Sequence, residues 1–172
     1  MAVIRSLSGE EARDAVPGLA DLLIDCVHGA ASVSFMAPLS EARAAAFWST
    51  VADGVVAGDR VLLVAEAPGG ALLGTVQLVL AQPENQPHRA DLAKMLVASG
   101  ARRQGIGEAL MRAAEEAGRA AGKTLLVLDT VTGSPAARLY TRLGWREAGT
   151  IPNYALMPDG APCATTYFYK AL

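Results

Sequence analysis

Several residue types are scarce in this 172-residue sequence, and each scarcity excludes a class of function. The only two cysteines, Cys26 and Cys163, lie far apart without histidine partners, so the sequence has neither metal-ligand spacing nor a dense disulfide framework. The two histidines, His28 and His88, also stand alone. A hydrolase triad and a zinc centre therefore have little support, and no metal site is expected.

Charge and long apolar runs are also limited. Charged residues make up 19% of the chain and the net charge is -2, which offers no basic surface of the kind that binds a phosphate backbone. No run approaches the about 18 apolar residues of a membrane span, and no basic segment followed by an apolar stretch opens the chain. We expect a cytoplasmic protein with neither nucleic acid nor membrane as partner.

The 52% hydrophobic content is enough to fill one core, so residues 1–172 are expected to form a single domain. Hydrophobic periodicity, caps and turn residues predict the elements. The strands are expected at 3–7, 60–67, 71–81, 91–98, 123–129, 145–150 and 163–171, and the helices within 9–28, 40–58, 105–121 and 134–144. Strand, helix and strand over 91–129 imply a parallel crossover. The prediction is a mixed α/β fold with a central sheet of about seven strands and about four helices.

Glycines fall between the expected strand 91–98 and the helix that follows it. Gly105 and Gly107 stand where the first backbone N–H groups of a helix are unpaired, and glycine lets a phosphate approach them closely. Arg102 and Arg103 add positive charge. The loop could bind a pyrophosphate, although the same glycines could simply permit a tight turn.

Two other nucleotide motifs do not fit this region. A dinucleotide fingerprint needs a third glycine where Leu110 stands. A Walker loop ending at Gly122-Lys123-Thr124 needs a glycine where Ala117 stands, and it must follow a strand whereas this stretch ends a helix.

Three pieces at matching spacing resemble the GNAT superfamily of N-acetyltransferases: Met95-Leu96-Val97, Arg102-x-x-Gly105-x-Gly107 and Leu139-Tyr140-x-x-Leu143-Gly144-Trp145. The flanks, LLIDCVHGAASVSFM and IPNYALMPDG, look similar to the tabtoxin resistance acetyltransferases within it. The resemblance implies the GNAT fold, with acetyl-CoA as co-substrate.

The resemblance also implies roles for individual residues. Backbone groups of Met95, Leu96 and Val97 would contact the pantetheine arm and the acetyl carbonyl, and Tyr140 would protonate the departing thiolate. Where many members carry asparagine this chain has Gly133, so that contact could move to Ser134. The pyrophosphate would lie on the amides of Arg102, Arg103, Gln104, Gly105, Ile106 and Gly107.

An attacking amine must lose a proton, and two acids flank the expected cleft. Asp91 begins one strand of the crossover and Asp129 ends the other, and the tabtoxin resistance proteins have acids at both positions. Alternatively, Asp91 pairs with Arg89 and Asp129 caps a turn. Tyr140 could likewise be an ordinary core residue.

The remaining candidates concern the acceptor and the surroundings of the site. His28 and Phe35 lie in the stretch where this family forms its acceptor pocket, although a lone histidine is more often structural. Phe47 and Trp48 are expected in the core, and Glu115 and Glu116 on a solvated helix face.

We therefore expect an N-acetyltransferase acting on the primary amine of a small molecule such as an amino acid, an antimetabolite or an antibiotic. Protein or peptide amines, and a non-catalytic acyl-CoA sensor, are the alternatives. The 151–162 loop and the edge of the last strand pair could support a homodimer.

Overall fold

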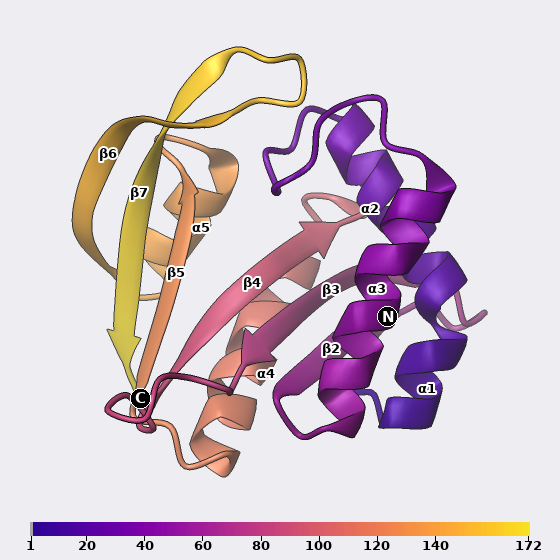
Figure 1. Ribbon diagram of the computed structural model, residues 1–172, viewed down its shortest axis with the longest axis horizontal. Helices are drawn as coiled ribbons and strands as arrows, with labels where there is room; N and C mark the ends of the chain where they lie inside the picture. Colours follow the sequence, from indigo (N-terminus) through magenta and orange to yellow (C-terminus); the bar gives the residue numbers. More distant parts are fainter. Residues whose placement is uncertain (1) are drawn as a thin grey trace.

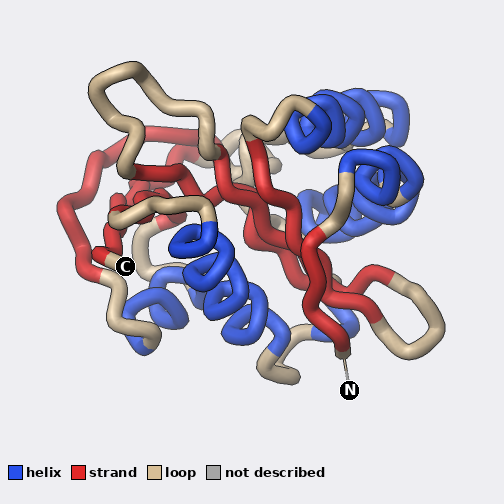
Figure 2. Tube along the Cα trace, turned by 90° about the horizontal axis from the view of Figure 1, so that it is seen from below, coloured by secondary structure: helices blue, strands red, loops and turns tan. Residues whose placement is uncertain are grey.

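The computed structural model describes residues 2–172, which form one mixed sheet covered on both faces by helices (Figures 1 and 2). The seven strands lie in the order β1-β2-β3-β4-β5-β7-β6. They are β1 (Val3–Ser6), β2 (Arg60–Glu66), β3 (Leu72–Val79), β4 (Arg89–Val97), β5 (Leu125–Val131), β6 (Arg146–Leu156) and β7 (Pro162–Ala171). The helices are α1 (Gly9–Asp14), α2 (Val16–His28), α3 (Glu41–Val56), the short 3-10 turn η1 (Ser99–Ala101), α4 (Ile106–Ala120) and α5 (Pro135–Arg142). No helix within this part of the chain is long and apolar enough to cross a bilayer.

The expected α/β fold is confirmed, with seven strands and with β4 parallel to β5. Five α-helices replace the expected four because the predicted helix over 9–28 divides at Ala15. Pro17 lacks an N–H group and so fits only the first turn of a new helix. The strand expected at 145–150 continues to Leu156, so β6 is longer than its sequence pattern indicated.

Two apolar cores lie on opposite faces of the sheet. One packs α4 and α5 against it, around Leu110, Met111 and Leu126. The other packs α1, α2 and α3 against it, around Trp48 and Leu62. Trp48 is fully buried, as expected, whereas Phe47 is only half-buried at the edge of this core.

The parallel pair at the centre of the sheet is short. β4 and β5 pair with each other only from Arg89 to Asp91 and from Leu125 to Val127. Beyond these residues β4 stays paired with β3 and β5 with β7, but the two strands no longer pair with each other. The sheet is therefore split at one end of these strands, and backbone groups of β4 and β5 face the opening instead of each other.

A β-bulge in β4 lies within this split. The register against β3 shifts between Ala93 and Leu96, and Lys94 in the shifted stretch has a left-handed backbone with φ 51°. Because a bulge inserts one residue, it reverses the alternation of side chains across the sheet. Leu92 accordingly packs in the core beside α4, whereas Leu96 packs in the opposite core beside α2.

A buried ion pair connects α4 to the last strand. Lys170 on β7 donates to both carboxylate oxygens of Glu115 at 2.8 Å and to the carbonyl oxygen of Leu143 at 2.7 Å. The indole N–H of Trp145 donates to the same carboxylate at 3.0 Å. The expectation that Glu115 lies on a solvated face is wrong, because these long-range partners compensate its buried charge; Glu116 is exposed.

Removing one partner of this ion pair should destabilise the fold. In Lys170→Met, Glu115 keeps its charge in a buried position, and we expect the free energy of unfolding to fall by about 3 kcal/mol in urea denaturation. Arg112→Met is the control, because Arg112 pairs with Glu108 on the exposed face of α4 and its loss should cost less than about 0.5 kcal/mol. Equal losses in the two variants would contradict a structural role for the buried pair.

Candidate active site

The glycine loop forms the start of α4, as its sequence pattern indicated. Gly105 is the N-cap with φ 81°, a left-handed conformation that suits glycine, and no side chain in the described part of the chain caps the helix. Arg102, Arg103 and Gln104 are exposed around it. The first backbone N–H groups of α4 are thus left free at a positively polarised helix end, with two arginines beside them, an arrangement that suits an anion.

Gly107 lies where three elements converge. A Cβ atom on this glycine would stand 3.2 Å from Cδ2 of Leu139 on α5, and 3.8 Å from both Sδ of Met95 and Cγ2 of Val97 on β4. Ile106 is buried beneath the loop. The helix start therefore lies directly against the split end of β4, and the close packing leaves little room for a side chain at Gly107.

The backbone at the end of β4 points into the split. The N–H of Ala98 donates to the carbonyl of Leu73, and hydrogen bonding alternates along an antiparallel pair, so the N–H and C=O of Val97 face away from β3. The carbonyl oxygen accepts from Cys26 Sγ at 3.6 Å and from Arg102 Nε at 3.4 Å. The N–H of Val97 faces the opening and is available to a ligand.

Tyr140 reaches this region from α5. Its ring packs against Trp145 and Phe168, and the residue is only 4% exposed. Burial raises the pKa of its hydroxyl above the ordinary 10.0, and the negative charge of Asp129 raises it further. Within residues 2–172 no group hydrogen-bonds the hydroxyl, so a core ring carries a polar group that is free to face a ligand.

The two candidate acids differ in their surroundings. Asp91 is bonded to Arg89 and accepts from Gln82 Nε2 at 3.1 Å, as the alternative interpretation of this residue held. Asp129 forms no ion pair in the described part of the chain. Its carboxyl group is open to solvent on one side, but the surrounding protein desolvates it and so raises its pKa above the ordinary 3.8. The positive charge of Lys94 opposes this rise, and the negative charge of Asp91 adds to it. Of the two candidate acids, Asp129 is therefore the one that combines a raised pKa with a carboxylate that no ion pair within residues 2–172 occupies.

Ser134 and His28 have structural partners. Ser134 caps α5 by accepting from the N–H of Ala137 at 3.1 Å, and its hydroxyl lies 3.4 Å from that of Thr130. Nε2 of His28 accepts from the N–H of Leu39 at 3.3 Å and so holds the loop between α2 and α3. A ligand contact by either side chain stays a prediction.

Near Asp129 the structure also places Lys94 and Tyr167, two residues that the sequence analysis did not single out. Phe35, a predicted acceptor residue, meets Phe47 edge-to-face at 5.3 Å between ring centroids. Lys94 Nζ lies 5.5 Å from the centroid of the Phe47 ring. Tyr167 pairs with Asp129 across the sheet, and its hydroxyl lies 2.7 Å from that of Tyr154, a hydrogen bond that raises the pKa of Tyr167 to about 12.

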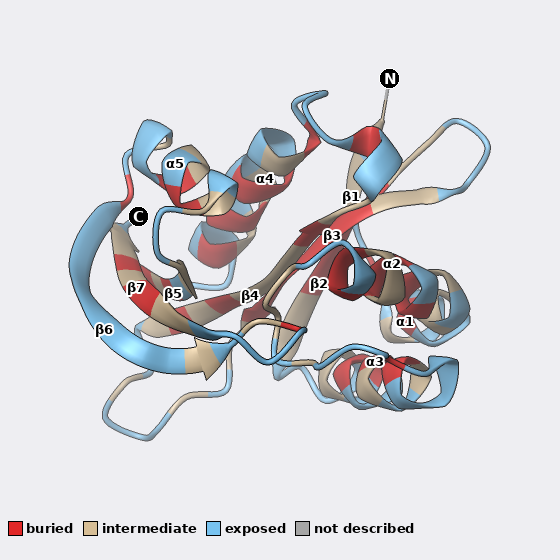
Figure 3. Ribbon diagram, turned by 90° about the horizontal axis from the view of Figure 1, so that it is seen from above, coloured by how far each residue is buried: buried red, intermediate tan, exposed pale blue. Residues whose placement is uncertain are grey.

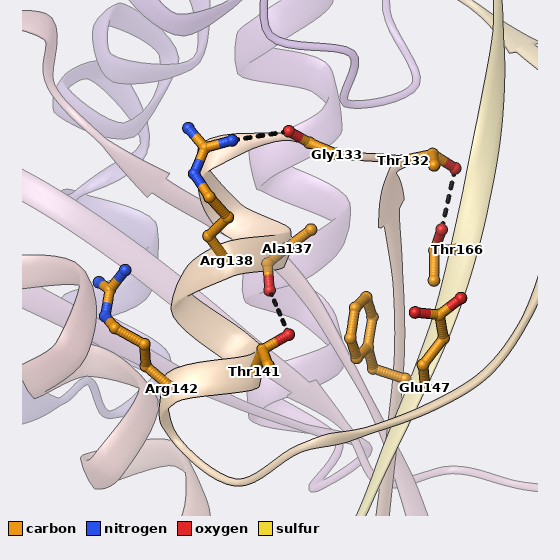
Figure 4. A pocket seen from close by; sticks show the side chains of 9 residues that line it. Thr132, Gly133, Ala137, Arg138, Thr141, Arg142, Glu147 and Thr166 are labelled. Atoms are coloured by element: carbon orange, nitrogen blue, oxygen red, sulfur yellow. Dashed lines mark hydrogen bonds between the residues drawn. The ribbon is translucent and has the colours of Figure 1, made fainter.

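An open groove of about 490 Å³ lies elsewhere, between α5 and the strands β6 and β7 (Figure 4). Its lining includes Thr132, Arg138, Arg142, Glu147 and Thr166. None of the candidate residues lines it, so it is separate from the split between β4 and β5.

Comparison with known proteins agrees with this geometry. The family described as acetyltransferase (GNAT) domain matches residues 58–147. The chain is 32% identical over 103 residues to aminoglycoside N(6')-acetyltransferase type 1 of Klebsiella aerogenes, covering 58% of this chain and 68% of that protein.

Solved structures share the fold. YncA of Salmonella typhimurium, solved with its cofactor acetyl-CoA, superposes with a TM-score of 0.81 at 16% identity and covers 100% of this chain and 94% of that one. Ribosomal-protein-alanine N-acetyltransferase of Brucella melitensis superposes with a TM-score of 0.80 at 23% identity over 99% of both chains.

The separation of β4 from β5, with the unpaired N–H groups at the start of α4 beside it, thus agrees with the comparisons in indicating an acyl-group transferase. The chain belongs to the GNAT acetyltransferase family. The narrower likeness to tabtoxin resistance proteins stays a prediction.

The raised pKa of Asp129 can be measured by ¹³C NMR titration of its carboxyl carbon. We expect a midpoint above 3.8 in the wild-type protein. In Lys94→Met the midpoint should rise further, because the lost positive charge had stabilised the carboxylate. An unchanged or lower midpoint in the variant would show that the charge of Lys94 does not stabilise the Asp129 carboxylate.

Proposed function

We propose that this acetyltransferase moves the acetyl group of acetyl-CoA onto the primary amine of a small molecule in the cytoplasm. The observation that carries the proposal is the convergence of the α4 start, the unpaired end of β4 and Tyr140 around one opening in the sheet. The acetyl-CoA in the structure of yncA supports this choice of donor.

The donor would lie along the split. Its pyrophosphate fits the amides from Arg102 to Gly107, where helix polarity and the arginine side chains favour negative charge. Its pantetheine arm fits beside β4, whose outward N–H at Val97 can donate a hydrogen bond to the arm or to the acetyl carbonyl oxygen. A donor fixed there stabilises the negative charge that develops on the oxygen during transfer.

The reaction needs one proton acceptor and one proton donor. As the amine nitrogen bonds to the acetyl carbon and the carbon–sulfur bond breaks, Asp129 accepts the amine proton, directly or through water. Tyr140 gives its hydroxyl proton to the departing thiolate, and solvent restores it. Asp91, held by Arg89, would act through its charge on Asp129.

Two hydrogen bonds across the acceptor end of the site favour a small acceptor over a protein tail. Ser32 Oγ donates to the carbonyl of Leu156 at 3.0 Å, and the N–H of Ala37 donates to that of Pro158 at 3.0 Å. They connect the loop between α2 and α3 to the turn between β6 and β7, two segments that lie at the same end of the sheet (Figure 1). The Klebsiella relative, an aminoglycoside acetyltransferase, is consistent with a small acceptor.

Tyr140→Phe tests the proposed acid. Removing the hydroxyl should lower kcat by at least about 100-fold, the usual contribution of general acid catalysis, because the thiolate then leaves unprotonated. Thiol release measures kcat over a panel of amino acids, β-lactam amines, polyamines, aminoglycosides and peptides.

Isothermal titration provides the control, because the substituted phenylalanine keeps the ring packing and acetyl-CoA affinity should stay within about threefold of wild type. Full activity in the variant would remove Tyr140 from the mechanism. Acetyl-CoA binding by the wild type without turnover on any amine would instead favour a sensor.

We further propose that β6 pairs two chains into a homodimer. This edge strand is exposed along almost its whole length (Figure 3), and Ile151, Tyr154 and Leu156 are 45%, 48% and 50% exposed. We expect sedimentation velocity at micromolar concentration to show a dimer, and Ile151→Lys to show monomer. A wild-type protein that sediments only as monomer would contradict the proposal.

A further inference from the structure

Lys94 is a largely buried cation without a carboxylate partner. Its ammonium group donates to Ser34 Oγ at 3.1 Å and lies over the Phe47 ring, and it forms no ion pair with any residue of 2–172. A lysine ammonium has three donors, so two remain for other acceptors. Burial lowers its pKa below the ordinary 10.5, and Arg60 lowers it further.

The bulge in β4 directs the Lys94 side chain toward the candidate acceptor site. Without the extra residue, strict alternation would place Lys94 on the same face as Leu92, inside the core beside α4. The left-handed backbone at Lys94 instead turns its side chain toward Phe47 on α3, on the opposite face. A non-glycine residue held in this conformation is a strained feature, and such features concentrate at functional sites.

Lys94 interacts with a second cation, Arg60, and with an acid on β5, Asp129. Arg60 lies close enough to affect Lys94, and within residues 2–172 only one of its side-chain nitrogens is hydrogen-bonded, to Gln77 Oε1 at 2.6 Å. On the β5 side, Asp129 also interacts with Lys94 but forms no ion pair with it. A cation and an acid that face one opening and do not neutralise each other suit a ligand that carries both charges.

We propose that Lys94 is a specificity-determining residue that binds a carboxylate or similar oxyanion of the acceptor, while Asp129 faces the acceptor's amine. The inference rests on the proposed function and narrows it to amines that carry a nearby anionic group, such as amino acids. Polycationic acceptors are disfavoured, because Lys94 repels them.

A purely structural role is the alternative, since the bond to Ser34 also ties down the loop between α2 and α3. Such a role would affect all acceptors equally. Discrimination between acceptors with and without the anion therefore separates the two possibilities.

The test compares matched acceptors. Methionine with 3-(methylthio)propylamine and lysine with cadaverine are pairs that differ by the carboxylate. β-Alanine with 2-aminoethylphosphonate exchanges the carboxylate for a phosphonate, and kanamycin is the polycationic acceptor. We expect wild type to prefer the anionic member of the first two pairs in kcat/KM. In Lys94→Met this preference should fall at least about tenfold, mainly through KM, because a charged hydrogen bond is lost.

Lys94→Arg should keep part of the kcat/KM preference that Lys94→Met loses. The control Arg119→Met removes a positive charge from the exposed side of α4 and should leave the preference unchanged. Comparable kcat/KM for β-alanine and 2-aminoethylphosphonate would extend the site to both oxyanions. A wild-type preference for kanamycin or the anion-free amines, or a ratio unaffected by Lys94→Met, would overturn the inference and leave the proposed function standing.

Binding gives a readout that does not need turnover. Titration of N-acetylmethionine and N-acetyl-3-(methylthio)propylamine into the protein saturated with coenzyme A should show tighter binding of the first to wild type and no difference in Lys94→Met. Absence of turnover on every amine would reject the proposed function, and this titration would still decide the role of Lys94. Equal affinities of wild type for the two ligands would reject that role.

Discussion

The site depends on the early end of the pairing between β4 and β5. After Asp91 and Val127 the two strands separate. The bulge at Lys94 then reverses which face of the sheet the alternate side chains of β4 point to. Buried backbone groups need partners, so a strand end left unpaired in the middle of a sheet is stable only where a ligand or solvent can reach it. The split therefore creates the opening together with a row of backbone groups that can bind a ligand there.

Local patterns were sufficient to predict the elements that carry the donor site. The strand expected at 91–98, the helix expected over 105–121 and the glycines between them are properties of short segments, and the structure confirms the two elements as β4 and α4. The charges of Lys94 and Glu115 could not be placed this way. The position of Lys94 follows from a bulge that only pairing with β3 reveals, and the burial of Glu115 follows from Lys170, 55 residues along the chain.

Charge couples Asp129 and Tyr140, the two residues proposed to transfer protons. Burial raises the pKa of Tyr140, and the carboxylate of Asp129 raises it further while Asp129 is ionised. In the proposed reaction Asp129 takes the proton of the amine and loses its charge. The effect on Tyr140 then disappears, and the hydroxyl becomes a stronger acid as the thiolate departs. In the proposed reaction, the charge interaction between Asp129 and Tyr140 thus favours proton donation after the amine attacks over donation before it.

The width of the opening is fixed by contacts between the two halves of the sheet. Near its closed end, three residue pairs join β4 to β5. Behind it, the bond from Lys170 to Glu115 ties β7 to α4. At the acceptor end, Ser32 and Ala37 bond to the turn between β6 and β7. The start of α4, where the exposed loop leaves free N–H groups, is the part that these contacts do not cover. In the proposed reaction a long donor would enter there. The acceptor would fit beneath the two loops that these bonds join, where Lys94 and Asp129 would select its charges.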